Sequence, residues 1–189
     1  MGFLDKLKSI TTPKKGEDVP WRFSNKSDAE SELGKWLLKA EDDDAEAMYK
    51  VGKMHLLDIW VGIYPKQAYE WLLKAAQHGH VESHYWLATM HEENLIFCSH
   101  DEGMFSPEKA FEWYKKGAIK GHTDSQVRLA SRYERGKGTS KNLVQAYRWY
   151  AMSGNAEYSL SRLREKMTDE ELKEARDLLT MCHISEDKT

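Results

Sequence analysis

The sequence predicts an all-α protein: an α/α superhelical solenoid of about four helix-pair repeats that ends in a charged capping helix. Two observations lead to this prediction. A short motif returns along the chain at a nearly constant interval, and the apolar residues around each copy follow the spacing of one helix face. The composition agrees, because only 4 of the 189 residues are proline, which favours helices over a β fold punctuated by proline turns.

The repeated motif is an alanine, two variable residues and a tryptophan. It occurs in full at residues 68–71, 110–113 and 146–149, and a weaker copy lies at residues 33–36. Successive tryptophans are separated by 35, 42 and 36 residues. A period of about 36 residues with one insertion explains these intervals. We expect the four repeated tryptophans to be core residues: Trp36, Trp71, Trp113 and Trp149.

Each full copy lies in an amphipathic helix. In the first one, Ala68, Leu72 and Ala75 fall on one stripe, and Gly79 follows where a glycine commonly ends a helix. Gly121 occupies the same place in the next copy. We expect a second helix in each unit, over residues 44–57, 81–93 and 123–135. A small residue returns at one position of these second helices and predicts close helix packing there: Gly52, Ala88 and Ala130.

Capping boxes mark both ends of the repeat region. One begins at Ser27 and opens the first helix, and another begins at Thr168 and opens a final charged helix that reaches about Met181. We therefore divide the chain into an N-terminal tail or linker at 1–27, a solenoid at 28–182 and a disordered tail at 183–189. Within the first segment, residues 3–10 have the pattern of a short amphipathic helix.

The repeats resemble the Sel-one-like repeat family, a relative of the tetratricopeptide repeat. The shared pattern combines Ala-x-x-Trp, a lysine with small residues, Gly-His and a Leu-Ala pair. Two copies carry it, at Ala68, Trp71, Lys74, Ala75, Ala76, Gly79, His80, Leu87 and Ala88, and at Ala110, Trp113, Lys116, Ala118, Gly121, His122, Leu129 and Ala130. The resemblance implies a curved superhelix that binds other proteins without chemistry of its own. It also implies that the helix with the Leu-Ala pair lines the concave side.

No pattern of catalytic or metal-binding residues stands out. His80, His84 and His91 have helical spacing, but His80 shares its repeat position with His122, so the repeat explains it better than a metal. The paired carboxylates fall at helix ends and are expected to be solvated, and no phosphate loop, GxSxG or HExxH motif occurs. We expect no enzyme activity, no metal and no cofactor.

Charge and hydropathy exclude other partners. The formal net charge of −3 gives no electrostatic reason to bind nucleic acid, and no apolar stretch is long enough for a transmembrane span. The two cysteines, Cys98 and Cys182, are far apart, which suits a reducing, cytoplasmic location. We expect a monomer or a weak dimer that binds a protein or peptide.

Alignment of the repeats predicts a partner-binding surface. Lys50, Trp86 and Arg128 share one position of the second helices, and the position two residues earlier holds Met48, His84 and Gln126. Both positions lie off the apolar stripe and are expected to face solvent or a partner. Apolar residues in two irregular loops would add a second patch: Trp60, Ile63, Leu95, Ile96 and Phe97. The alternative is that Trp86 and the loops pack internally.

These features favour a protein-interaction module, such as an adaptor, a co-chaperone-like factor or a regulatory scaffold. A more specific alternative is a bacterial immunity protein that neutralises a cognate toxin. Self-assembly through the solenoid ends is a further alternative, although the charged last helix argues against it. A hydrolase is the remote alternative, because no catalytic constellation is present.

Overall fold

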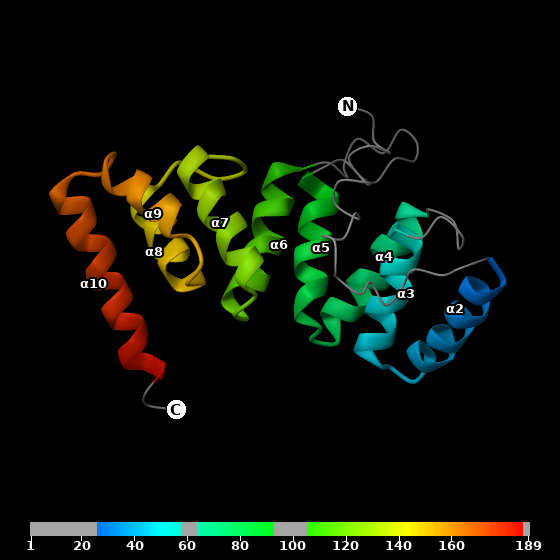
Figure 1. Ribbon diagram of the computed structural model, residues 1–189. Coiled ribbons are helices and arrows are strands. Elements are labelled where there is room, and N and C mark those ends of the chain that lie inside the picture. The colour runs from blue at the N-terminus through cyan, green and yellow to red at the C-terminus, as the bar shows by residue number, and fades with distance from the viewer. Residues whose placement is uncertain (1–25, 58–63, 93–105, 187–189) are drawn as a thin grey trace. The chain divides into compact units, whose positions relative to one another are not determined.

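The computed structural model describes residues 26–57, 64–92 and 106–186, and the regular elements in these ranges are all α-helices (Figure 1). In chain order they are α2 (Lys26–Glu41), α3 (Ala45–Leu57), α4 (Pro65–Gln77), α5 (Val81–Glu92), α6 (Pro107–Ile119), α7 (Thr123–Arg135), α8 (Leu143–Ser153), α9 (Glu157–Arg164) and α10 (Asp169–Glu186). The predicted all-α class is confirmed. We call the tryptophan-bearing helices α2, α4, α6 and α8 A-helices, and the helices α3, α5 and α7 that follow them B-helices.

The chain forms two compact units. Among the described residues, the first unit comprises 26–57 and 64–83, and the second comprises 84–92 and 106–186. The division falls within α5, so its first residues belong to the first unit and the rest to the second.

In the first unit α3 packs against α2 and, more extensively, against α4. Gly52 of α3 makes this packing close. A Cβ atom at position 52 would lie only 2.8 Å from Cγ and 3.2 Å from the backbone nitrogen of Leu72 in α4. The absence of a side chain therefore lets the two helices approach, as the recurring small residues predicted. Ala68, Leu72 and Ala75 are all fully buried.

In the second unit α7 packs on α6 and α8, and α10 packs on α8. Ala88, Leu129 and Ala130 are fully buried in its core together with Tyr114 and Leu163. The loop after α7 fits tightly against the start of α6. Gly138 has a φ of 76°, and a Cβ atom there would lie 2.0 Å from the carbonyl oxygen of Pro107, so only glycine fits.

Most helix ends follow the sequence prediction. Gly79 and Gly121 have φ angles of 92° and 83°, which is the left-handed conformation of a terminating glycine. Thr168 and Glu171 form a reciprocal capping box, with each backbone N–H donating to the side chain of the other residue. Two boundaries differ: α2 begins at Lys26, so Ser27 lies inside the helix, and α10 continues to Glu186, into the segment predicted as a tail.

The repeated tryptophans correct one prediction. Trp149 is buried, with 7% of its surface exposed, but Trp36, Trp71 and Trp113 are only partly buried. The lysine three residues later covers each of these rings: its Nζ atom lies 4.9 Å from the ring centre of Trp36, 4.4 Å from that of Trp71 and 4.1 Å from that of Trp113. Residues three apart meet on a helix surface, so a cation shields a ring that the core does not enclose.

Candidate partner-binding surface

The residues that begin the B-helices share one function, the capping of the helix N-terminus. Asp44 accepts hydrogen bonds from the backbone N–H groups of Glu46 and Ala47. His122 occupies the equivalent position before α7, and its Nδ1 accepts from the N–H of Ser125 at 3.2 Å. His80 does the same for Ser83 at 3.3 Å. The repeated histidines are therefore helix caps that satisfy free backbone donors.

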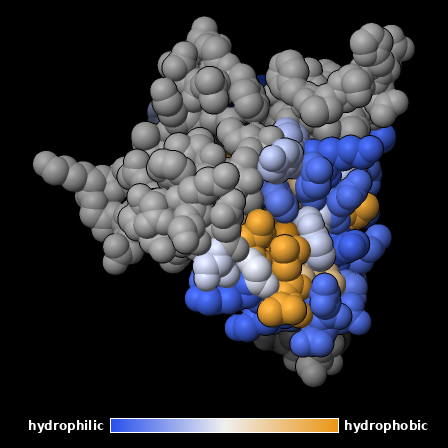
Figure 2. All heavy atoms as spheres, turned by 90° about the vertical axis from the view of Figure 1, so that its right-hand side faces the viewer, coloured by the Kyte–Doolittle hydropathy of each residue, from blue (hydrophilic) through white to orange (hydrophobic). Residues whose placement is uncertain are grey.

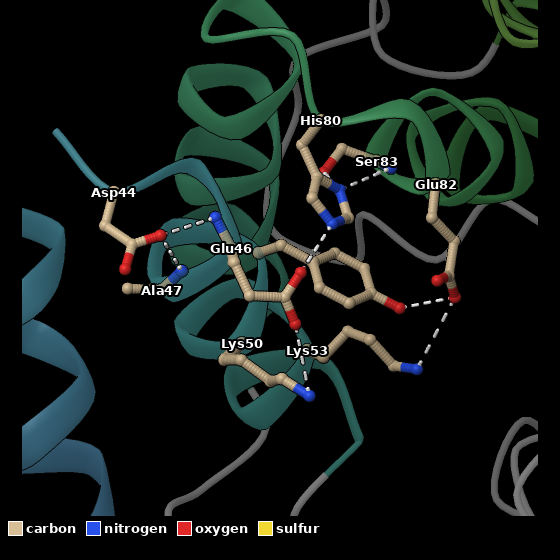
Figure 3. A network of polar contacts seen from close by, with 9 residues as sticks. Asp44, Glu46, Ala47, Lys50, Lys53, His80, Glu82 and Ser83 are labelled. Atoms are coloured by element: carbon tan, nitrogen blue, oxygen red, sulfur yellow. Dashed lines mark hydrogen bonds and ion pairs between the residues drawn. The ribbon is translucent and has the colours of Figure 1, made fainter. Parts of the chain in front are cut away.

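His80 also connects α3 to the start of α5 in the first unit (Figure 3). Because its Nδ1 accepts the capping hydrogen bond, its Nε2 is the donor to Oε2 of Glu46, at 3.0 Å. The imidazole ring stacks on Tyr49 with 4.2 Å between ring centres. Glu46 in turn pairs with Lys50 at 3.3 Å. Its carboxylate is held by two neighbours while its side chain stays 53% exposed.

Lys53 is the buried cation of this cluster. Its side chain is 7% exposed, and its Nζ lies 3.9 Å from Oε1 of Glu82. Tyr49 donates its hydroxyl hydrogen bond to the same Glu82 carboxylate, and the Lys53 amine lies 5.2 Å from the centre of the Tyr49 ring. Burial lowers the pKa of Lys53 to about 8, although the charge of Glu82 opposes the shift.

In the second unit, aromatic side chains surround the start of α7. The Tyr85 ring lies 5.4 Å from the His122 ring and 5.8 Å from the Tyr114 ring. Arg128 of α7 is exposed. Burial acts to lower its pKa, but the nearby Tyr114, Tyr85 and Glu92 side chains outweigh this effect and raise it overall.

A buried polar cluster joins α5, α6 and α7. Glu92 accepts a hydrogen bond of 2.8 Å from the Tyr114 hydroxyl, and it pairs with Arg132 at 3.2 Å and Lys137 at 3.3 Å. Burial acts to raise the pKa of Glu92, but the Tyr114 hydrogen bond and the nearby cations outweigh it and lower this pKa overall. Burial also raises the pKa of Tyr114, so its hydroxyl stays a donor.

The predicted binding residues divide into three groups. Lys50 is partly exposed and Arg128 is exposed, as expected. Met48, His84 and Trp86 are 3%, 4% and 8% exposed, so these three side chains do not face solvent. For Trp86 this burial favours the alternative of internal packing. The remaining five residues lie outside the described part of the chain: Trp60, Ile63, Leu95, Ile96 and Phe97.

Packing against an A-helix explains the burial of the B-helix repeat position that His84 shares with Gln126. Its ring meets that of Trp113 in α6 edge-on, with 5.8 Å between centres. Gln126, at the same repeat position, is buried and donates from its amide to the carbonyl oxygen of Ala118 at 3.3 Å. The repeat position that His84 and Gln126 share is therefore partly an inter-helix position. Trp86, at the other repeat position, meets its neighbour Tyr85 within α5 edge-on at 5.9 Å.

Among the described residues, no three His, Cys, Asp or Glu side chains converge in a way that could hold a metal ion. Within the same residues, no helix combines the length and the apolar character needed to cross a bilayer.

Sequence reasoning missed the capping function of the histidines and the pairing of Tyr114 with Glu92. A signal for the first was present, because His-x-x-Ser occurs at both 80–83 and 122–125 and matches the spacing of an N-cap with its N3 residue. The second had a weaker signal, the recurrence of tyrosine and glutamate at 150 and 134.

The helix pairs and their capped junctions define a tetratricopeptide-type α/α solenoid. The Sel1 repeat model matches residues 45–80, 81–122 and 123–158, and the chain belongs to the Sel1 repeat family. No curated protein matches the sequence significantly.

Two solved structures show the same fold. One is a protective antigen present in uropathogenic Escherichia coli strains and displaying an SLR fold, with 23% identity, a TM-score of 0.69 and coverage of 83% of this chain. The chain spans only 33% of that antigen. The other is a Sel1 repeat protein from Oxalobacter formigenes, with 21% identity, a TM-score of 0.56 and coverage of 77% of this chain and 98% of that protein.

Proposed function

We propose that this chain is a protein-binding module that contacts its partner through the exposed polar side chains of its B-helices. One observation carries the proposal: Lys50 in α3 and Arg128 in α7 occupy the same repeat position, and both keep a cation accessible. The Sel1 repeat family supports it, because proteins built from these repeats generally act as protein-interaction scaffolds. Solenoids present extended concave surfaces to their partners, and we propose, as the family resemblance implies, that the B-helices line this surface.

The chemistry of this surface favours a partner segment that carries both acidic and polar groups. The Nζ atom of Lys50 lies 5.9 Å from the centre of the Trp36 ring, and Tyr85 and Tyr114 lie near Arg128. An arginine beside aromatic residues is typical of interface hot spots. In the first unit, Glu46 and Glu82 remain about half exposed, with 53% and 44% of their side chains accessible. These carboxylates would accept hydrogen bonds from the partner or repel an unsuitable acidic one.

The two apolar loops belong to the same proposal as a second patch. Trp60, Ile63, Leu95, Ile96 and Phe97 occupy loops where the copy at residues 136–140 is polar. Apolar and aromatic side chains supply most of the binding energy in a buried interface core. Lys50 and Arg128 would then set the orientation of the partner and the rate of association, while the loop residues would supply affinity.

Adaptor, co-chaperone-like factor and regulatory scaffold are the roles that we propose for such a module, with a non-enzymatic mode of action. An immunity protein would use the same surface against a toxin. The identity of the captured protein distinguishes these roles: a chaperone or a signalling complex indicates an adaptor, and a toxin whose activity is blocked on binding indicates immunity.

Affinity capture with charge-reversal variants tests the proposal. The immobilised full chain is compared with Lys50→Glu and Arg128→Glu, and with matched controls on exposed A-helix positions, Lys66→Glu and Lys115→Glu. We expect at least a tenfold weaker capture of the same protein by the two B-helix variants and little change in the controls. Equal capture by all four variants would contradict the proposed surface.

A further inference from the structure

One repeat position always faces the B-helix that precedes its own A-helix. Leu72 of α4 meets Gly52 of α3. The hydroxyl of Tyr114 in α6 lies 3.2 Å from Oγ1 of Thr89 in α5, and the hydroxyl of Tyr150 in α8 bonds Glu134 of α7 at 3.4 Å. Leu72, Tyr114 and Tyr150 are 0%, 0% and 3% exposed.

In α2 this position is Leu37, and α2 is the first helix of the described chain, so no described helix precedes it. Leu37 and Leu33 are accordingly only partly buried, and the adjacent Leu38 is 68% exposed. Figure 2 views the molecule from the side on which α2 lies in Figure 1 and shows apolar residues gathered in a band between hydrophilic ones. Leu33, Leu37 and Leu38 define what we call the α2 face.

The size of Leu33 disfavours an ordinary repeat as the occupant of this face. Its position holds Ala68, Ala110 and Ala146 in the later A-helices, all fully buried. A leucine there adds bulk where a B-helix would have to approach as closely as in the other repeats. A second copy stacked end to end is also disfavoured, because α10 carries many exposed charged residues: Asp169, Glu170, Lys173, Glu174, Arg176 and Asp177.

We propose that the N-terminal segment of the same chain covers the α2 face. This segment lies outside the described residues, but its sequence and its attachment to α2 suit it to this face. Phe3, Leu4, Leu7 and Ile10 have the spacing of one helix face, and so supply an apolar stripe without the dimensions of a repeat helix.

The connection is long enough for this docking. Fifteen residues, 11–25, join the segment to α2 and can span about 50 Å when extended. The 16 residues of α2 are only about 24 Å long. Because the segment is tethered to the helix, its effective concentration at the α2 face is on the order of millimolar. This favours the segment over a free partner or a second copy.

A double-mutant cycle in the full chain tests this contact. Leu37→Glu is measured by urea unfolding in the native background and in a Leu7→Glu background, and Ile119→Glu is the matched control, because Ile119 is an exposed apolar residue of α6 with 66% of its surface accessible. If residues 3–10 cover the α2 face, the shift in urea midpoint caused by Leu37→Glu falls by at least half in the Leu7→Glu background. The Ile119→Glu shift stays the same. Equal Leu37→Glu shifts in both backgrounds would overturn the proposal.

Photo-crosslinking identifies the occupant independently of stability. Benzoylphenylalanine is placed at position 37 of the full chain, and the products are separated by mass and mapped by mass spectrometry. Our proposal predicts a product of monomer mass that links position 37 to a peptide within residues 1–25. A product of dimer mass would identify a second copy instead. Intramolecular links only to residues beyond 41 would show that the N-terminal segment does not bind there.

Discussion

Tyr114 donates a hydrogen bond of 2.8 Å to Glu92, and this pairing returns one repeat later. There Tyr150 donates to Glu134 at 3.4 Å, and Glu134 also pairs with Arg162 at 2.6 Å and Lys166 at 3.5 Å. In both cases an A-helix tyrosine meets a carboxylate at the end of the preceding B-helix, and cations that follow later in the chain neutralise that carboxylate.

In the first repeat, apolar residues occupy the equivalent positions. The positions equivalent to Glu92 and Tyr114 are Leu56 and Leu72, which are 1% and 0% exposed. The second compact unit therefore contains hydrogen-bonded junctions where the first has an apolar one. We expect the two units to respond differently to loss of a junction residue.

Loss of the carboxylate should be more damaging than loss of the hydroxyl. Tyr114→Phe removes one hydrogen bond and should lower the free energy of unfolding by about 1 kcal/mol. Glu92→Ala leaves Arg132, which is 2% exposed, without its carboxylate, and should cost about 3–5 kcal/mol. Urea unfolding measures both, with the exposed Glu112→Ala as control. A smaller loss for Glu92→Ala than for Tyr114→Phe would contradict the described geometry.

The lowered pKa of Lys53 predicts that the free energy of unfolding depends on pH in the alkaline range. Its pKa is about 8 in the folded chain against an ordinary value of 10.5. Between these two values the unfolded chain binds a proton that the folded chain lacks, so the free energy of unfolding rises with pH. Lys53→Met should therefore stabilise the protein most at or below pH 8, with a gain that shrinks toward pH 10.5. Unfolding curves across this range test the point, and a pH-independent gain would show that Lys53 keeps an ordinary pKa.

Substitutions at two glycines of similar conformation distinguish the stability cost of backbone strain from that of a steric clash. Gly79 and Gly138 both have positive φ angles, but a Cβ atom at Gly79 would meet nothing within 4 Å, whereas one at Gly138 would lie 2.0 Å from the Pro107 carbonyl oxygen. Gly79→Ala should cost about 1–2 kcal/mol from its left-handed conformation alone. Gly138→Ala should cost clearly more, because the loop must also move off α6. Equal thermal shifts for the two variants would contradict the close approach.

Trp86 should act as a packing residue. Its surface is 8% exposed, like the 7% of Trp149, so alanine at either position should lower the free energy of unfolding by about 3–5 kcal/mol. The partly exposed Trp71 should lose less. The same Trp86→Ala protein is then tested for affinity to a captured partner. A large loss of affinity with unchanged stability would instead make Trp86 a binding hot spot.

The sequence predicted the parts of this fold that depend on local periodicity. The helices, the terminating glycines and the small residues at Gly52, Ala88 and Ala130 all follow from spacing within one or two turns. Exposure of individual positions was less predictable. Whether His84 faces solvent or Trp113 depends on how the two helices cross, and a sequence pattern does not specify that angle.

The exposure of the residues in the proposed binding surface follows from the sequence in part, for the same reason. Lys50 is partly exposed and Arg128 is exposed, as expected, because a repeated long polar residue off the apolar stripe is typical of an exposed position. The Tyr114–Glu92 contact was missed because tyrosine and glutamate are each common on helix surfaces, and only the packing of α5 on α6 buries them together. The sequence leaves both alternatives open for Trp86, because a single aromatic replacement fits an interface and a core equally well.

Hydrogen–deuterium exchange of the full chain, with and without its purified partner, tests the proposed binding mode most directly. If the partner lies on the B-helices, exchange slows in α3 and α7, around Lys50 and Arg128, while α4 and α6 change little on their exposed faces. Protection confined to the A-helices α4, α6 and α8 would contradict the account and place the partner on the opposite side of each helix pair.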